Sequence, residues 1–191
     1  MIREQARPTF SVFIILTLIT GIFYPFLVTS VAQTFFRDKA NGSLIYQNGQ
    51  AVGSELIGQT FNDSKYLWGR PSATAPTFNG AASSGSNLGP SNPSLLESIR
   101  VRIKILKEAD PGNTQLVPVD LVTASASGLD PHISPAAAYY QAPRIARIRG
   151  IAESEVNGFI KKHTEGRFFG LLGEPVVNVL KVNLALDAHG K

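Results

Sequence analysis

The sequence predicts an α+β fold, with a single N-terminal transmembrane helix followed by one mixed α/β soluble domain. Three observations lead to this prediction. A long uncharged apolar run stands near the N-terminus, a β-hairpin signal follows it, and Pro, Asn and Gly stand where helices begin and end. With 191 residues, 43% hydrophobic and 17% charged, the chain has room for one anchor and one domain and is too apolar to be disordered.

The charge balance is mildly basic. Eighteen Lys and Arg against 14 Asp and Glu give a net charge of +4, and much of the excess lies in residues 100–107 and 144–149. Such clusters are typical of solvated helix faces or of faces turned toward a partner or lipid headgroups, and less often of nucleic-acid sites. We therefore expect no nucleic acid as a partner. The absence of Cys excludes disulfides, thiolate metal sites and a Cys nucleophile.

Residues 10–32 are predicted to form the transmembrane helix. No formal charge appears between Arg7 and Arg37. At 1.5 Å per residue the run is long enough to cross a hydrocarbon core of about 30 Å. Its Ser and Thr hydroxyls can bond to carbonyls of the same helix. Pro25 lacks an N–H, so we expect it to kink the helix or loosen its last turns.

A cleaved signal peptide is the alternative for this segment. Arg3 and Arg7 make a positive start, and residues 30–32 (Ser-Val-Ala) resemble a cleavage site. The apolar run exceeds the roughly 7–15 residues usual in signal peptides, which favours an uncleaved anchor. The slightly more positive N-terminal flank favours residues 1–9 in the cytoplasm and the domain, residues 40–191, on the periplasmic side.

The domain is predicted to begin with a hairpin and a long loop. Residues 43–53 form the hairpin with Asn48-Gly49 at its tip, because both central residues of such a turn need positive φ. Phe61 and residues 66–68 (Tyr-Leu-Trp) are expected to continue a small sheet. Residues 69–93, rich in Gly, Pro, Ser, Ala and Asn, are expected to be either a functional loop or a mobile surface loop.

A helix is predicted to start at Asn92-Pro93 and to stop at residues 109–112. The alternation of apolar and basic residues over 99–105 is a strand pattern instead, but the capping signals and the length favour the helix. Residues 116–122 are predicted to be a strand, at a sheet edge because of Pro118. A loop over residues 123–131 follows.

The C-terminal part is predicted to be mainly helical. Ser134-Pro135 and Pro143 each look like helix starts, and Gly150 looks like a helix end. Residues 153–163 form another short helix. Residues 176–186 are apolar with two embedded Asn residues and suit either a strand or a helix.

The sequence offers no catalytic constellation. His132, His163 and His189 do not have the spacing of a helical zinc pair. The H-E-x-x-H, G-x-S-x-G and S-x-x-K motifs are absent from the sequence. We therefore expect neither an enzyme nor a metal site.

Two Ser/Gly loops, residues 84–87 and 125–128, can present backbone N–H groups to an anion. They lack the Lys and the Mg²⁺-binding carboxylate of a phosphate-binding motif. Asp130 and His132 stand near the second loop, but such close sequence neighbours rarely converge into a triad. From the residues alone, an accessory subunit and an anchored or secreted extracytoplasmic binding protein both fit.

Six strings and the anchor carry a resemblance to a known family. The strings are residues 58–61 (GQTF), 68–73 (WGRPSA), 84–93 (SGSNLGPSNP), 122–133 (VTASASGLDPHI), 141–144 (QAPR) and 178–187 (NVLKVNLALD). In this order, and with an anchor ending in Tyr24-Pro25, they resemble the C subunit of the bacterial Kdp potassium-transporting ATPase over nearly the whole chain. Lys181 departs from the family pattern, in which an acidic residue is expected.

The resemblance implies a non-catalytic accessory subunit of a high-affinity, ATP-driven potassium uptake complex in the bacterial inner membrane. The implied partners are a channel-like K⁺-translocating subunit, a P-type ATPase subunit and a small single-span subunit, with membrane lipid around the anchor. Family members are described as assisting assembly and as raising the ATP affinity of the ATPase subunit, a role called catalytic chaperone. No firmly bound cofactor is implied, and ATP would be reached through the complex.

The resemblance also implies site residues. A Ser/Gly string likened to the signature motif of ABC transporters gives the nucleotide-binding candidates Ser125, Ser127, Gly128 and Asp130. A domain outside the cell does not meet cytoplasmic ATP, so we favour an indirect effect, in which the anchor packs on the channel-like subunit and the domain covers the ion entrance. The partner-interface candidates are Gly21, Tyr24, Pro25, Arg70, Pro71, Ser86, Asn87, Gln141 and Arg144, with Gly21 allowing close helix approach.

Overall fold

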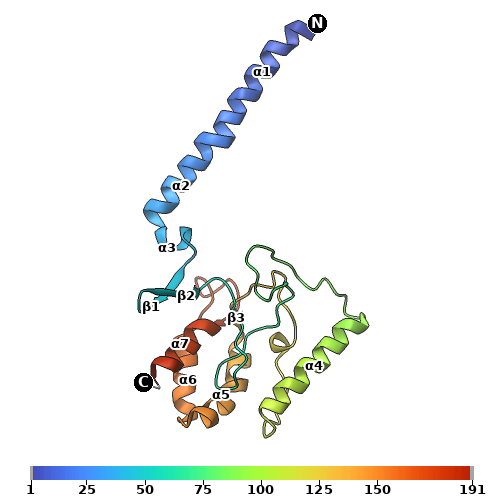
Figure 1. Ribbon diagram of the computed structural model, residues 1–191, viewed down its shortest axis with the longest axis vertical. Coiled ribbons are helices and arrows are strands. Elements are labelled where there is room, and N and C mark those ends of the chain that lie inside the picture. Colours follow the sequence, from blue (N-terminus) through green and yellow to red (C-terminus); the bar gives the residue numbers. More distant parts are fainter. Residues whose placement is uncertain (1, 190–191) are drawn as a thin grey trace. The chain divides into compact units, whose positions relative to one another are not determined.

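The structure, a computed structural model, describes residues 2–189, with side chains from residue 5 onward. The chain divides into two compact units, Met1–Leu44 and Ile45–Lys191 (Figure 1). The first is helical and apolar, and the second mixes helices with short strands. The predicted α+β class, with one apolar N-terminal helix before a mixed domain, is confirmed.

The first unit is one nearly continuous helix. It consists of α1 (Ile2–Leu18), the π-helical turn η1 (Ile19–Phe23), α2 (Tyr24–Phe35) and the short α3 (Arg37–Ala40). By length and composition, Gln5–Phe35 is able to cross a membrane. The helix therefore extends past the predicted residues 10–32 at both ends.

The irregularity of this helix lies just before Pro25, in the π turn, whereas the turns after Pro25 in α2 remain α-helical, so the predicted loosening of the last turns is absent there. Pro25 has no N–H to give to the carbonyl four residues before it. In the turn just before it, the N–H of Tyr24 donates to the carbonyl of Ile19, five residues back. The hydroxyl of Thr20 donates to the Leu16 carbonyl at 2.7 Å, and other Ser and Thr hydroxyls of the helix behave likewise.

The second unit begins with the predicted hairpin, β1 (Leu44–Gln47) and β2 (Gln50–Ser54). At its tip Asn48 and Gly49 have φ of 50° and 79°. Both angles are positive, as a two-residue turn of this kind requires. The prediction from the Asn-Gly pair is confirmed.

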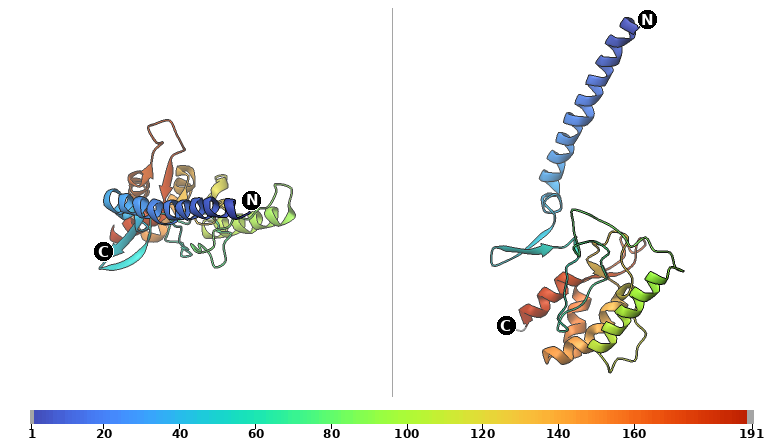
Figure 2. Two further views of the ribbon diagram at one scale, coloured as in Figure 1. Left: turned by 90° about the horizontal axis from the view of Figure 1, so that it is seen from above. Right: turned by 45° about the vertical axis from the view of Figure 1, so that its right-hand side comes forward.

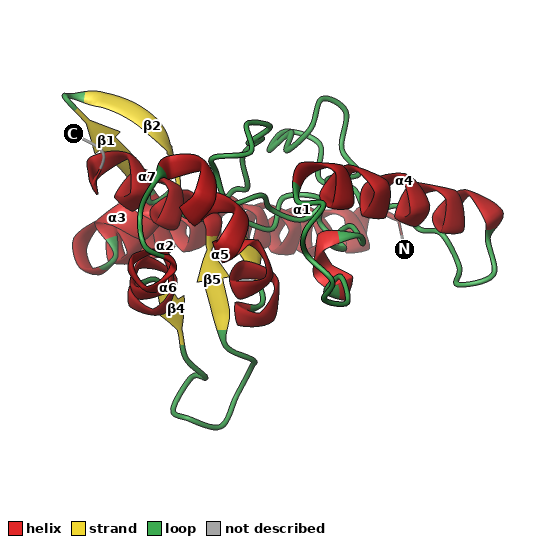
Figure 3. Ribbon diagram, turned by 90° about the horizontal axis from the view of Figure 1, so that it is seen from below, coloured by secondary structure: helices red, strands yellow, loops and turns green. Residues whose placement is uncertain are grey.

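A small antiparallel sheet and three helices form the centre of the second unit. The strand order is β3 (His132–Ile133), β5 (Val176–Asn178), β4 (Thr164–Glu165). Figures 2 and 3 show α5 (Pro135–Arg149), α6 (Glu153–Lys162) and α7 (Val179–His189) gathered beside this sheet. The fully buried apolar side chains include Leu67, Leu121, Ile145, Val156, Ile160, Val177, Val182 and Leu186.

Helix α5 begins at the predicted Ser134-Pro135, whose Ser hydroxyl accepts a hydrogen bond from the Ala137 N–H at 3.0 Å. It ends at Gly150, in the left-handed conformation, as predicted. The second predicted start, at Pro143, is wrong because Pro143 lies inside this helix. The deeply buried face of α5 outweighs the one backbone hydrogen bond that Pro143 cannot make.

Two predicted strands are absent from the described residues. Residues 116–122 instead form a loop with the 3₁₀ turn η2 (Val119–Leu121). Phe61, Leu67 and Trp68 pair with no strand, and residues 63–66 form a turn closed by a hydrogen bond from the Tyr66 N–H to the Asp63 carbonyl at 3.1 Å. Residues 176–186, left open between strand and helix, turn out to be both, since β5 runs directly into α7.

Side-chain amides take the place of a strand partner for residues 67 and 68. Asn183 accepts from the Leu67 N–H at 2.8 Å and donates to the Leu67 carbonyl at 2.9 Å. Gln141 accepts from the Trp68 N–H at 2.9 Å and donates to the Trp68 carbonyl at 3.1 Å. Each buried backbone group is thereby satisfied without a sheet.

Candidate functional site

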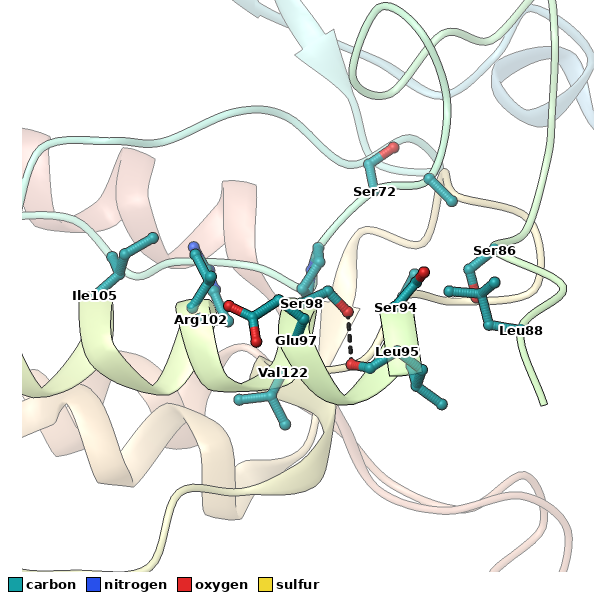
Figure 4. Close-up of a pocket in the computed structure, with 14 residues that line it drawn as sticks. Ser72, Ser86, Leu88, Ser94, Leu95, Glu97, Ser98, Arg102, Ile105 and Val122 are labelled. Carbon is teal, nitrogen blue, oxygen red and sulfur yellow. Dashed lines mark hydrogen bonds between the residues drawn. The ribbon is translucent and has the colours of Figure 1, made fainter. Parts of the chain in front are cut away.

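The strongest candidate site is a groove of about 650 Å³ along α4 (Pro93–Ala109) (Figure 4). One wall is α4 itself. The other walls come from two loops, residues 71–88 and 122–124. Its lining is mainly apolar and includes Pro71, Ala73, Leu88, Leu95, Val101, Ile105, Val122 and Ala124. Three of the six family-like strings thus meet at one groove.

Helix α4 forms because its start is capped as predicted. The Asn92 side chain accepts from the Ser94 N–H at 2.9 Å, and Pro93 occupies the first turn. The helix ends at Ala109, just before Asp110-Pro111-Gly112. The helical reading of this segment is confirmed over the strand reading.

The alternation over residues 99–105 has a structural explanation. Two steps along a helix turn by about 200°, so alternating residues fall on opposite faces. Ile99 and Ile103 pack against the core. Val101 and Ile105 line the groove and remain 49% and 41% exposed. Helix α4 therefore has two apolar faces, and the second lines the groove.

Arg102 joins α4 to the loops at the groove floor. Its guanidinium donates to the Leu121 carbonyl and to the Gly69 carbonyl, both at 3.1 Å, and lies over the Trp68 ring at 5.6 Å. Burial lowers the pKa of Arg102 from its usual value. These bonds fix both walls of the groove to the same helix.

Arg70 and Ser72 tie the two loops together. The Arg70 guanidinium donates to the carbonyls of Thr123 and Ala124, each at 3.3 Å, and to the Asp130 carboxylate at 3.4 Å. The Ser72 hydroxyl donates to the Gly128 carbonyl at 2.6 Å. The string GRPSA thus braces the string SASGLD.

The four nucleotide-binding candidates all make bonds within their own loop region. Ser125 Oγ accepts from the Gly128 N–H at 2.9 Å, and Ser127 Oγ accepts from the Leu129 N–H at 3.1 Å. The Asp130 carboxylate accepts from the His132 N–H at 2.9 Å. This network gives the loop a structural role, and direct nucleotide contact stays a prediction.

The pKa of the Asp130 carboxyl lies below its usual value. Burial alone would raise the pKa of its carboxyl, but hydrogen bonds from the side chain and backbone of His132, together with the charges of His132 and Arg70, hold it below the usual value. Among residues 2–189, no group of three or more His, Asp and Glu side chains is placed to hold a metal ion.

Gly128 lies at a position in this loop that has no room for a side chain. Its φ is +67°, and a Cβ there would lie 2.5 Å from the Ser84 carbonyl oxygen. We expect Gly128→Ala to lower the free energy of unfolding by about 1–3 kcal/mol, measured by denaturant titration of the full chain in detergent. The matched control is Gly158→Ala in α6, where nothing lies within 4 Å, so no loss is expected. Equal stability of the two variants would contradict the close packing.

The structure distributes the partner-interface candidates over three environments. Pro71 and Ser86 line the groove, with Asn87 exposed beside Ser86 and Arg70 half-buried under the loops. Gln141 and Arg144 lie instead in the core, so direct contact with a partner would require the core to open. Gly21, Tyr24 and Pro25 are exposed on the helix of the first unit.

Sequence reasoning did not single out Val101, Ile105 and Leu88 as site residues. The signal for the first two was the alternation over 99–105, which indicates a two-faced helix once the caps are accepted. Lys181, the departure from the family pattern, forms ion pairs with Glu55 at 2.9 Å and Glu165 at 3.7 Å. Its positive charge is therefore matched locally.

The candidate span and the groove together define a class: membrane-associated chains with one apolar helix and a globular domain that offers an apolar groove. A family model described as K⁺-transporting ATPase, c chain, matches residues 6–188. The chain belongs to this family, the KdpC family, and the predicted resemblance is confirmed.

The chain is similar to known relatives over almost their whole length. The chain is 62% identical over 183 residues to the potassium-transporting ATPase KdpC subunit of Methylococcus capsulatus, covering 95% of this chain and 96% of the relative. It is 59% identical over 188 residues to that of Methylibium petroleiphilum, covering 98% of both chains. It is 54% identical over 190 residues to that of Dechloromonas aromatica, covering 99% and 100%.

Proposed function

We propose that this chain is a non-catalytic accessory subunit of a high-affinity, ATP-driven potassium uptake complex. It assists assembly of the complex and raises the ATP affinity of the P-type ATPase subunit, as a catalytic chaperone. Its partners are that subunit, a channel-like K⁺-translocating subunit and a small single-span subunit. The observation that carries the proposal is the groove along α4, whose apolar face has no partner within the described part of this chain.

The groove suits a protein partner. Val101 and Ile105 stand exposed on a regular helix, and exposed apolar surface of this kind marks interaction sites. The loops beside them are held in place by hydrogen bonds from Arg70 and Arg102. Binding a partner therefore costs little conformational entropy. The family-like strings supply the walls, which connects the groove with what the family shares.

The effect on ATP is indirect in this proposal. The N-terminus is cytoplasmic and the domain lies outside, where it meets the ion entrance and not cytoplasmic ATP. The anchor contacts the channel-like subunit around Gly21, which has nothing within 4 Å of its missing Cβ. To change ATP affinity, the chain must bind the ATP-competent state of the complex more tightly than the other state.

The test is K⁺-stimulated ATP hydrolysis by the purified complex, with and without this chain, over a range of ATP concentrations. We expect omission to abolish the activity or to raise the apparent KM for ATP. The substitution Ser127→Ala distinguishes direct contact with ATP from an indirect effect. If the effect is indirect, the KM for ATP should be unchanged. Unchanged activity and ATP dependence without the chain would contradict the proposal.

An anchored or secreted extracytoplasmic binding protein is the second candidate. The groove volume of about 650 Å³ lies within the roughly 300–1,000 Å³ of small-molecule sites. Its secreted form requires cleavage after Ala32. Sequencing the N-terminus of the mature chain decides this point, since a start at Met1 or Ile2 excludes secretion.

A further inference from the structure

A second apolar feature lies between β4 and β5, far along the chain from the groove. Residues 168–172 (Phe-Phe-Gly-Leu-Leu) form a loop that we name the apolar finger. Figure 3 shows this loop extending away from the helices beyond the ends of β4 and β5. Phe168, Phe169, Leu171 and Leu172 are 66%, 84%, 81% and 65% exposed. This surface contributes little to the core.

Four of the five backbone N–H groups of the apolar finger donate hydrogen bonds within the loop or to Arg167 beside it. The N–H of Phe168 donates to the Leu172 carbonyl at 2.8 Å, and the N–H of Leu172 donates back at 3.0 Å. The N–H groups of Gly170 and Leu171 donate to the carbonyls of Arg167 and Phe168. Pairing lowers the cost of moving these N–H groups out of water into the interfacial region of a bilayer.

The tip has a conformation that a bulky residue rarely adopts. Phe169 and Gly170 have φ of 52° and 73°, and the Leu171 N–H closes the turn on the Phe168 carbonyl at 3.1 Å. A left-handed Phe is uncommon and is held here by the bonds on both sides. Its ring lies against the neighbouring Phe168 ring, with 4.4 Å between the centroids and 57° between the ring planes, and the side chain is 84% exposed. The side chain is therefore directed outward and not into the protein.

The charges flanking the finger are neutralised by one another. No charged residue stands between Arg167 and Glu174, and the Arg167 guanidinium binds both carboxylate oxygens of Glu174 at 2.8 Å. Glu165, on β4, lies 3.7 Å from the Lys181 ammonium. The carboxylates nearest the finger thus have cationic partners, which reduces their repulsion from anionic lipid headgroups.

We infer that the apolar finger inserts into the interfacial region of the lipid bilayer to which the chain is attached. The candidate span Gln5–Phe35 leads into the domain through residues 36–43, so this short link keeps the domain close to a bilayer at all times. Aromatic side chains favour the membrane–water interface, and Leu side chains favour the acyl region below it. The finger is then a second, reversible membrane contact, independent of the α4 groove.

The experiment places a fluorescent reporter at the tip. Phe169→Trp in the full chain is reconstituted into vesicles of phosphatidylcholine and phosphatidylglycerol, with or without bromine on the acyl chains. The control is Leu116→Trp, at a 93% exposed position in a polar loop. The emission of the native Trp68 is measured on the unsubstituted chain and subtracted from that of each variant. We expect the tip Trp to show blue-shifted emission and strong loss of emission in brominated lipid, and the control Trp to show neither.

Two results overturn the inference. In the first, the Trp at position 169 emits and is quenched like the Trp at position 116, which places the finger in water. In the second, the same measurement on the assembled potassium-transport complex leaves the tip blue-shifted but unquenched by brominated lipid. The finger would then be covered by another subunit and not by the bilayer. Since the first measurement needs no partner subunit, its failure is distinguishable from failure of the proposed function.

Discussion

Replacing Arg144 by Met is expected to lower the free energy of unfolding of the domain by about 3–5 kcal/mol. The buried guanidinium donates to the carbonyls of Ser64 and Tyr66, the latter at 3.1 Å, and to Gln141 Oε1 at 2.7 Å. It also lies over the Trp68 ring at 4.3 Å. Met fills part of the volume but leaves one buried and two partly buried acceptors without this donor.

Arg144 keeps its charge despite this burial. Burial lowers the pKa of the Arg144 guanidinium to about 10, and the nearby Asp110 carboxylate acts in the opposite direction. At neutral pH the side chain is therefore a cation whose donors serve backbone and side-chain acceptors. Loss of such a group is costly because its partners are buried or partly buried and are left without their donor.

The measurement is denaturant unfolding of the full chain in detergent, followed by the emission of Trp68 beneath the guanidinium. Arg100→Met on α4 is the control, because Arg100 is 76% exposed and its ion pair with Glu97 spans 3.9 Å. For this variant we expect a change within about 0.5 kcal/mol. A transition midpoint for Arg144→Met equal to that of the control would show that residues 64–68 are held by other contacts.

The double variant Val101→Asp, Ile105→Asp is expected to prevent assembly of the complex while leaving the domain folded. Both side chains are exposed in the groove, so the core is unaffected. Removing two apolar side chains from a buried interface weakens binding by roughly 4 kcal/mol, or about a thousandfold in the dissociation constant. Desolvation of the new carboxylates weakens binding further.

Co-purification of this chain with the other subunits checks the result, together with a thermal melt of the isolated chain. Leu116→Asp, Val119→Asp is the matched control, since both residues are exposed and apolar but lie outside the groove. The control should assemble normally. Normal assembly of the groove variant would exclude the α4 groove as the docking surface.

Local signals in the sequence predicted the elements that local bonds define. The hairpin follows from Asn48-Gly49, and the starts of α4 and α5 follow from Asn92 and Ser134, because each of these features involves residues within a turn of one another. The long loop after Gly69 follows from its composition. These parts need no knowledge of tertiary contacts.

The errors occur where distant residues decide the structure. Residues 66–68 have a strand-like composition, but Asn183, 116 residues away from Leu67, provides the hydrogen bonds that a neighbouring strand would have made. Pro143 resembles a helix start, yet the buried face of α5 continues through it. No local pattern reveals either outcome.

The candidate site was predicted in part. The strings around Arg70, Ser86 and Ser127 do come together, but as the braced walls of a groove whose helix contributes the exposed apolar side chains. The sequence marked Gln141 and Arg144 as candidates for contact, and both are buried and hydrogen-bonded to residues 64–68.

The π turn before Pro25 divides the apolar helix into two halves with different angular phase. A π turn accommodates one extra residue, and one residue corresponds to about 100° of rotation. In an ideal α-helix, one face would continue unbroken from α1 into α2. Across Ile19–Phe23 this face is instead rotated about the helix axis by about a quarter of a turn. A straight neighbouring helix that packs on one face of α1 therefore contacts a different face of α2 beyond the π turn.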